Sequence, residues 1–235
     1  MDINLIIPVF GDHSDNLEAL LAGIECQNFT GRYHVHIAED IIPKALRDKY
    51  ESLDSSRYTF YPNDTGKQLY ALKNICRVLD SIQGDSIIGI VDGDDYLTGA
   101  NCFQKVHDTH EKGFPVVWTA NRWDINGLNH SGPLDDARSV YDHPWVSSHF
   151  RTFSLALYKD LSPVNFTNED GEFFEKCYDQ ALMLPLIHLC HLSGGRTKYI
   201  PDVHYIYRGR IDHEGEGRKL QLKYENFIRS RGYVA

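Results

Sequence analysis

The chain alternates between short apolar runs and segments whose apolar residues recur every three or four positions. The runs at 3–10, 33–38 and 86–91 predict buried strands. Between the strands, apolar side chains at helical spacing predict helices over 17–27 and 69–82. The segments 43–53 and 57–61 fit a further short helix and strand. Alternation of strand and helix predicts an α/β fold with a mostly parallel central sheet flanked by helices.

The second half is less regular. Its pattern predicts a helix over 100–112, a strand over 115–119, a long loop or hairpin over 121–141 and a late strand over 199–207. A helix is expected from Tyr178, with a kink at Pro185. The polar tail from Arg208 favours a solvated helix over a cover for a bound pyrophosphate. We see no repeat or linker, so 1–235 is predicted to be a single domain.

One apolar run organises the chain because it ends abruptly in carboxylates. Residues 86–91 are followed by Asp92, Gly93, Asp94 and Asp95. In open α/β sheets ligands bind at the carboxyl edge of the strands, and Gly93 allows a turn there without a Cβ clash. Clustered acids repel one another unless a cation neutralises them, and hard oxygen ligands suit Mg²⁺ or Mn²⁺. The pattern therefore predicts a metal and a phosphate at this edge, against the alternative of a plain acidic turn.

Composition narrows the class of partner. The net charge of −9 over 235 residues argues against stable nucleic-acid binding, which depends on clustered Lys and Arg. The five scattered cysteines read as reduced core thiols, not as zinc ligands. Neither a leader sequence nor an apolar run of membrane-spanning length is evident. We therefore expect a cytoplasmic protein, either free in solution or peripheral to a membrane.

Several short motifs lie at the expected strand ends. The first strand ends in Pro8-Val9-Phe10, and the second in Glu39-Asp40. Asn63, Gly66 and Asn74 precede the acidic strand, which ends in Asp92-Gly93-Asp94-Asp95. Together these motifs resemble glycosyltransferase family 2, the nucleotide-sugar enzymes with a GT-A fold. The resemblance is good over about residues 3–100 and looser over 145–210.

The resemblance implies a function for each motif. The donor, UDP-linked by expectation, would bind in the half 1–100. Pro8, Val9 and Phe10 would line its site, and Asp40, more than Glu39, would read the base. Asp92 would contact the ribose or sugar, while Asp94 with Asp95 would hold Mn²⁺ or Mg²⁺ on the diphosphate. The remaining donor-site candidates are Asn63, Gly66, Gly93 and Lys67, the last of which would either assist at a phosphate or be a solvated residue.

The half 101–210 would bind the acceptor, a glycan, a lipid-linked sugar or another hydroxyl compound, and 211–235 would be a tail. An inverting transfer needs a base for the acceptor hydroxyl. Asp179 resembles the family's base best, although Tyr178 stands where the family has Glu. The pair Glu169-Asp170 is the alternative. Further candidates are His204, Arg208 and His213 near the metal, His149 and Arg151 on the acceptor side, and Trp118, Trp123 and Trp145 as sugar-stacking or core residues.

Other functions fit parts of the same pattern. A Mg²⁺-dependent phosphatase of the haloacid dehalogenase type also places D-x-D after an apolar strand, but Tyr96 departs from its motif. A non-catalytic nucleotide-sugar-binding domain would share the fold without turnover. A third alternative is an enzyme that modifies a nucleic-acid base, against which the acidic charge argues. The sequence leaves the donor sugar and the acceptor open.

Overall fold

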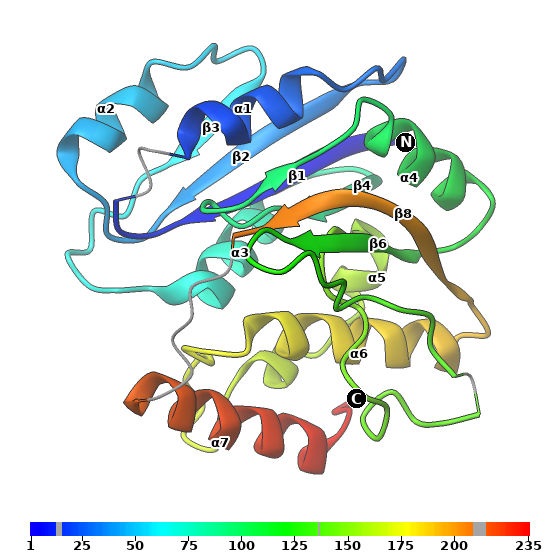
Figure 1. Cartoon of the computed structure of the whole chain (residues 1–235). Coiled ribbons are helices and arrows are strands. Elements are labelled where there is room, and N and C mark those ends of the chain that lie inside the picture. Colours follow the sequence, from blue (N-terminus) through cyan, green and yellow to red (C-terminus); the bar gives the residue numbers. More distant parts are fainter. Residues whose placement is uncertain (13–15, 136, 209–214) are drawn as a thin grey trace.

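A single mixed sheet forms the centre of the protein. The computed structural model describes residues 1–12, 16–135, 137–208 and 215–235. Within them, eight strands pair in the order β3-β2-β1-β4-β7-β6-β8-β5 (Figure 1). The strands are β1 (Asp2–Val9), β2 (Tyr33–Glu39), β3 (Tyr58–Tyr61), β4 (Ser86–Ile90), β5 (Tyr96–Leu97), β6 (Val116–Trp123), β7 (Arg151–Ser154) and β8 (Thr197–Tyr207).

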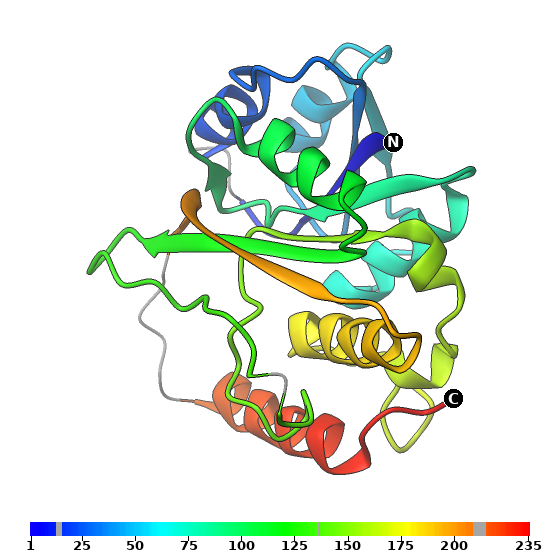
Figure 2. The same ribbon diagram turned by 90° about the vertical axis from the view of Figure 1, so that its right-hand side faces the viewer.

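Helices cover both faces of this sheet (Figures 1 and 2). One face carries α1, α2 and α4, and the other carries α3, α5 and α6, with α7 packed outside α6. This arrangement confirms the expected α/β fold class. The helices are α1 (Leu17–Glu25), α2 (Lys44–Glu51), α3 (Tyr70–Ser81), α4 (Cys102–Glu111), α5 (Leu155–Lys159), α6 (Tyr178–Leu192) and α7 (Glu216–Arg231), with a 3₁₀ turn at Pro163–Phe166.

The first four strands in the sheet order are parallel. β1 pairs with β2 and with β4, and β2 pairs with β3. Their carboxyl ends therefore meet at one edge, where the sequence places its acids. β7 lies between β4 and β6 and is antiparallel to both, with Arg151 opposite Ile90. The sequence pattern did not predict β7 or the two-residue strand β5.

The central strands are buried on both faces, as the apolar runs predict. Leu5 and Ile7 of β1 pack in the layer with α1 and α4, whereas Ile6 packs in the layer with α3 and α6. Ile87 and Ile88 of β4 divide between the layers in the same way. This double burial fixes the strand ends and hence the acids that follow them.

The C-terminal helix is more than a solvated tail, which corrects the expectation from its polar composition. Tyr224 and Ile228 of α7 are buried in the layer that contains α6. The guanidinium of Arg229 donates to the carbonyl oxygens of Tyr141 and His143 at 2.9 and 2.8 Å. α7 thus holds the long irregular segment that follows β6. That segment starts later than expected, because β6 continues to Trp123.

Among the described helices, none combines the length and the apolar character needed to cross a membrane.

Candidate active site

The turn after β4 is pressed against the end of β1. The amide of Gly93 donates to the carbonyl of Pro8 at 3.2 Å. A Cβ at position 93 would lie 2.8 Å from Cγ1 of Val9 and 3.0 Å from the Pro8 oxygen. Glycine is therefore required for this close approach, which sets Asp92 and Asp94 beside the β1 end.

A cavity of about 390 Å³ opens at this edge of the sheet and is called the first cavity below. Most of the residues that line it lie at the carboxyl ends of β1, β2 and β4, as the parallel topology requires. Its walls also include side chains from α3, from the segment before α6 and from β8. The lining residues are Pro8, Val9, Phe10, Asp40, Ala71, Asn74, Asp92, Gly93, Asp94, Lys176, Tyr178 and Tyr207.

The carboxylate of Asp92 is surrounded by polar side chains from α6, from β7 and from the segment just before β7. Its Oδ1 accepts a hydrogen bond from the hydroxyl of Tyr178. Its Oδ2 lies 3.7 Å from Nη2 of Arg151 and 3.9 Å from Nδ1 of His149. Burial raises the pKa of Asp92 to about 6; the charge of Arg151 and the Tyr178 hydrogen bond oppose this rise, and Asp94 adds to it. Arg151, which is fully buried, thus compensates part of the negative charge of the acidic turn.

Asp95 is not part of the wall of the first cavity. Its side chain is fully buried and accepts hydrogen bonds from the hydroxyl of Tyr205 and the backbone N–H of Arg208, both at 2.8 Å. Burial, together with the charges of Asp92 and Asp94, raises its pKa well above the ordinary value. Asp95 therefore joins the end of β8 to the acidic turn.

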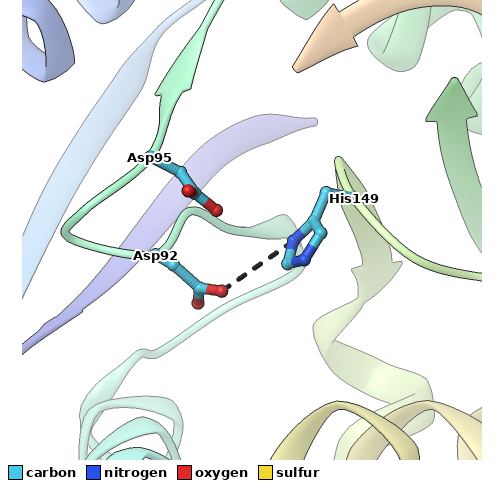
Figure 3. Close-up of side chains that lie close together, drawn as sticks. All are labelled: Asp92, Asp95 and His149. Carbon is cyan, nitrogen blue, oxygen red and sulfur yellow. Dashed lines mark ion pairs between the residues drawn. The ribbon is translucent and has the colours of Figure 1, made fainter. Parts of the chain in front are cut away.

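Three of these side chains are close enough to share one metal ion. Ligand atoms of Asp92, Asp95 and His149 all lie within 4.8 Å of one another (Figure 3). The sequence pointed to Asp94 and Asp95 for this role. Asp94 is half-buried and faces the first cavity, whereas both oxygens of Asp95 already accept hydrogen bonds. A set dominated by carboxylate oxygens fits Mg²⁺ or Mn²⁺.

A second cavity, of about 490 Å³, shares the wall residue Tyr207 with the first cavity. Asp179, in the first turn of α6, is part of its wall. Burial raises the pKa of Asp179 and Glu225 adds to the rise, whereas Arg151 and backbone N–H groups oppose it. The lining residues are Asn121, Trp123, His130, Trp145, Ser148, His149, Asp179, Gln180, Tyr207, Arg218, Gln221 and Glu225.

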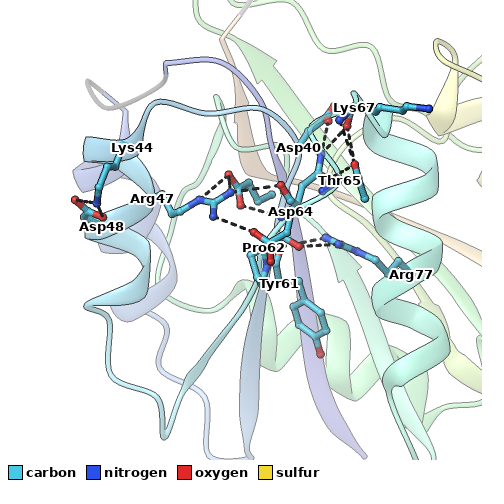
Figure 4. Close-up of polar contacts among 12 residues, drawn as sticks. Asp40, Lys44, Arg47, Asp48, Tyr61, Pro62, Asp64, Thr65, Lys67 and Arg77 are labelled. Carbon is cyan, nitrogen blue, oxygen red and sulfur yellow. Dashed lines mark hydrogen bonds and ion pairs between the residues drawn. The ribbon is translucent and has the colours of Figure 1, made fainter.

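Four residues that the sequence suggested for the donor site do not line the first cavity. Glu39 is buried, and its carboxylate accepts from the Arg47 guanidinium and from the backbone N–H of Asn63. The Asn63 side chain shapes the following turn, accepting from Thr65 and donating to the carbonyl of Lys67. Gly66 takes a positive φ of 67° in that turn, and the exposed side chain of Lys67 extends away from it (Figure 4).

Asp40 lies in the first cavity and also caps α3. Its carboxylate accepts from the backbone N–H groups of Leu69 and Tyr70 at 2.7 and 3.0 Å. Tyr70 has a positive φ of 61°, an uncommon conformation for a tyrosine. The start of α3 is thus held against the carboxyl end of β2.

The remaining candidates divide between the site and the rest of the molecule. His204 is buried beside Thr98, and the exposed Glu169 forms an ion pair with Lys223. Trp118 is buried and donates to the Gly132 carbonyl, so its place is in the core. Within the described chain, Arg208 contacts Asp95 through its backbone, and His213 lies outside the described residues.

Sequence reasoning missed several residues of the site. Tyr178, Tyr205 and Tyr207 contact Asp92, Asp95 or the two cavities, and Lys176 lines the first cavity. Of these residues, only Tyr178 could have been recognised from the sequence, because it immediately precedes the candidate base Asp179.

Comparison with known proteins gives a clear result for the fold. The crystal structure of S. aureus TarS 1–349 with UDP aligns with a TM-score of 0.67 at 17% identity, over 89% of this chain and 61% of that chain. This chain therefore shares the fold of TarS, which confirms the expected GT-A fold. The complex of TarS 1–349 with UDP-GlcNAc aligns with a TM-score of 0.66 at 18% identity, over 100% and 62% of the two chains.

This chain therefore spans about three fifths of the TarS fragment. No protein-family model and no curated protein sequence matches it. At these identities the likeness to TarS concerns the fold.

Proposed function

We propose that this protein transfers a sugar from a nucleotide diphosphate sugar, UDP-linked, to a hydroxyl group of an acceptor. One observation carries the proposal: two cavities share the wall residue Tyr207, with Asp92 and Asp94 in the first and Asp179 in the second. A group transfer needs donor and acceptor sites that open onto each other, with a base on the acceptor side. The fold shared with a protein crystallised with UDP and UDP-GlcNAc supports the same class of donor.

The donor would occupy the first cavity. We assign its base to the end with Asp40 and its diphosphate and sugar to the end with Asp92 and Asp94. Lys176 lines the same cavity and would add a positive charge near the diphosphate. This assignment places the donor mainly against the half 1–100, with Lys176, Tyr178 and Tyr207 of the half 101–210 completing the wall of the first cavity. Residues of α7 line only the second cavity of the two.

The carboxylates of the acidic turn would hold Mn²⁺ or Mg²⁺. We assign Asp94 as the ligand that faces the cavity, with Asp92 and Asp95 behind it. Such an ion would stabilise the negative charge that develops on the leaving diphosphate. The buried Arg151 supports this arrangement by keeping Asp92 ionised and fixed.

Asp179 would act as the general base. Its position in the wall of the second cavity suits contact with an acceptor hydroxyl, and its raised pKa brings the carboxylate closer to the basicity such a step needs. Because a single base acts from the acceptor side, we propose inversion at the anomeric carbon. Trp123 and Trp145 in the same wall would pack against the acceptor.

The direct test is ligand binding followed by turnover. Thermal unfolding is measured with UDP, ADP, GDP and CDP, each with Mn²⁺ and with a chelator. UDP at about 100 times its dissociation constant should add about 2.7 kcal/mol and raise Tm by several degrees. Release of UDP from UDP-sugars, with water as the default acceptor, then identifies the sugar. A protein stabilised by none of the nucleotides would contradict the proposal.

A further inference from the structure

The first cavity contains a buried amide that no protein group satisfies. Asn74 of α3 is 0% exposed and belongs to the cavity wall. Neither its Oδ1 nor its Nδ2 has a hydrogen-bond partner among the described residues. An amide carries one acceptor and one donor group side by side, and leaving both unpaired away from water costs free energy. The great majority of buried polar side chains avoid this cost, so Asn74 calls for an explanation.

The position of Asn74 separates it from the metal-binding end of the cavity. Asp40 follows β2 and Asp92 follows β4, and β1 lies between these strands. The two carboxylates are therefore about two strand spacings apart, or roughly 10 Å. Asn74 lies one helical turn after Tyr70, whose N–H donates to Asp40. The unpaired amide thus belongs to the end of the cavity that contains Asp40.

The carboxylate of Asp40 cannot make all the hydrogen bonds that recognition of a base requires. Its carboxylate only accepts hydrogen bonds, and its two oxygens already accept from the N–H groups of Leu69 and Tyr70. The edge of a uracil base presents an N3–H donor next to a carbonyl acceptor. Recognition of both groups needs an acceptor and a donor side by side, which an Asn amide supplies.

We propose that the side-chain amide of Asn74 reads the N3–H and the adjacent carbonyl of the uracil base, and that the free protein tolerates an unsatisfied amide for this purpose. The inference rests on the proposed function, because it needs a uridine nucleotide in the first cavity. Replacing Asn74 by an apolar residue should therefore have two opposite effects. It should remove the free-energy cost of the unpaired amide in the free protein, and it should weaken binding of the uridine nucleotide.

The test compares Asn74→Leu with Asn165→Leu. Asn165 is equally buried, but its amide donates to the carbonyls of Ser162 and Val234 and accepts from the Val234 N–H. We expect Asn74→Leu to keep or raise Tm in the absence of ligand and to weaken UDP binding by about tenfold or more. Asn165→Leu should lower Tm and leave the dissociation constant for UDP unchanged.

Modified nucleotides test the contact in the unmodified protein. UDP methylated at N3 should bind about tenfold more weakly than UDP, or worse, whereas 2′-deoxy-UDP should bind nearly as well as UDP. The inference is overturned if N3-methyl-UDP binds as tightly as UDP, or if only the deoxy analogue loses affinity. It is also overturned if Asn74→Leu lowers Tm as Asn165→Leu does while UDP affinity is retained. Absence of UDP binding to the wild-type protein would instead contradict the proposed function.

Discussion

The hydroxyl of Tyr178 donates a hydrogen bond to Oδ1 of Asp92, and so joins the first residue of α6 to the turn after β4. The same hydroxyl accepts from Nη2 of the buried Arg151 at 3.0 Å. One phenol thus connects the carboxylate of the first cavity, the buried cation and the helix that carries Asp179.

Replacing Tyr178 by Phe should weaken this connection without changing the packing of the ring. Hydrogen bonds to charged groups contribute about 1.5–3 kcal/mol, so we expect the free energy of unfolding to fall by about 2 kcal/mol. UDP affinity should fall as well, because Asp92 loses its orienting partner. Urea unfolding and isothermal titration would measure the two effects. Unchanged stability together with unchanged affinity would show that the hydrogen bond is not formed in solution.

Asp94→Asn and Asp179→Asn should separate binding from transfer. Asp94→Asn is expected to abolish the Mn²⁺-dependent part of UDP binding, because it removes the carboxylate charge that faces the first cavity. Asp179→Asn should leave UDP affinity within about twofold and lower the rate of UDP release at least about a hundredfold, the effect typical of losing a general base. Equal loss of binding in the two variants would contradict this division of roles.

Gly93→Ala should displace the acidic turn. The added Cβ would meet Val9 and the Pro8 carbonyl, both part of a buried strand, at 2.8–3.0 Å. Overpacking of this kind costs about 1–3 kcal/mol, and UDP binding should weaken because Asp92 and Asp94 move. Gly217→Ala is the matched control, since a Cβ there has no neighbour within 4 Å among the described residues. Its stability should stay the same or rise by up to about 1 kcal/mol.

His110 makes stability depend on pH. Burial lowers its pKa from 6.5 to about 3, and among the described residues its Nδ1 has no partner. Below pH 6.5 the unfolded chain takes up a proton that the folded chain refuses, so stability falls as the pH falls through this range. From pH 7.5 to 5.5 the contribution is about 1.4 kcal/mol.

Comparison with His110→Gln separates the contribution of His110 to the pH dependence of stability from that of the carboxylates. Chemical unfolding at the two pH values should show a smaller loss of stability in the variant than in the wild type, by about 1.4 kcal/mol. Identical pH dependence of the two proteins would mean that His110 takes up its proton at the same pH in the folded and in the unfolded chain.

Much of the first cavity could be predicted because its residues lie at strand ends. Parallel strands align their carboxyl ends, so the runs that precede Asp40 and Asp92 were enough to bring these acids to one edge. Asp95 illustrates the limit of that reasoning, since adjacent acids in a turn point in different directions. Its partner Tyr205 is 110 residues away, and no local pattern announces such a contact.

Other parts of the site depend on strand and helix pairings that the sequence pattern did not reveal. Arg151 comes close to Asp92 because β7 pairs antiparallel with β4, opposite Ile90. A short strand between irregular segments has no periodicity that would predict its neighbour. The polar composition of α7 likewise concealed its role, because the two buried residues that anchor it are few among many charged ones.

The shared position of Tyr207 has a consequence for redesign of specificity. A substitution there changes the walls of both cavities at once, so any gain with a new donor would be accompanied by a change on the acceptor side. Trp145 and three residues of α7 line the second cavity and not the first: Arg218, Gln221 and Glu225. Under the proposed function, acceptor preference would therefore change through these positions, by selection or in a library, while the nucleotide end stays constant.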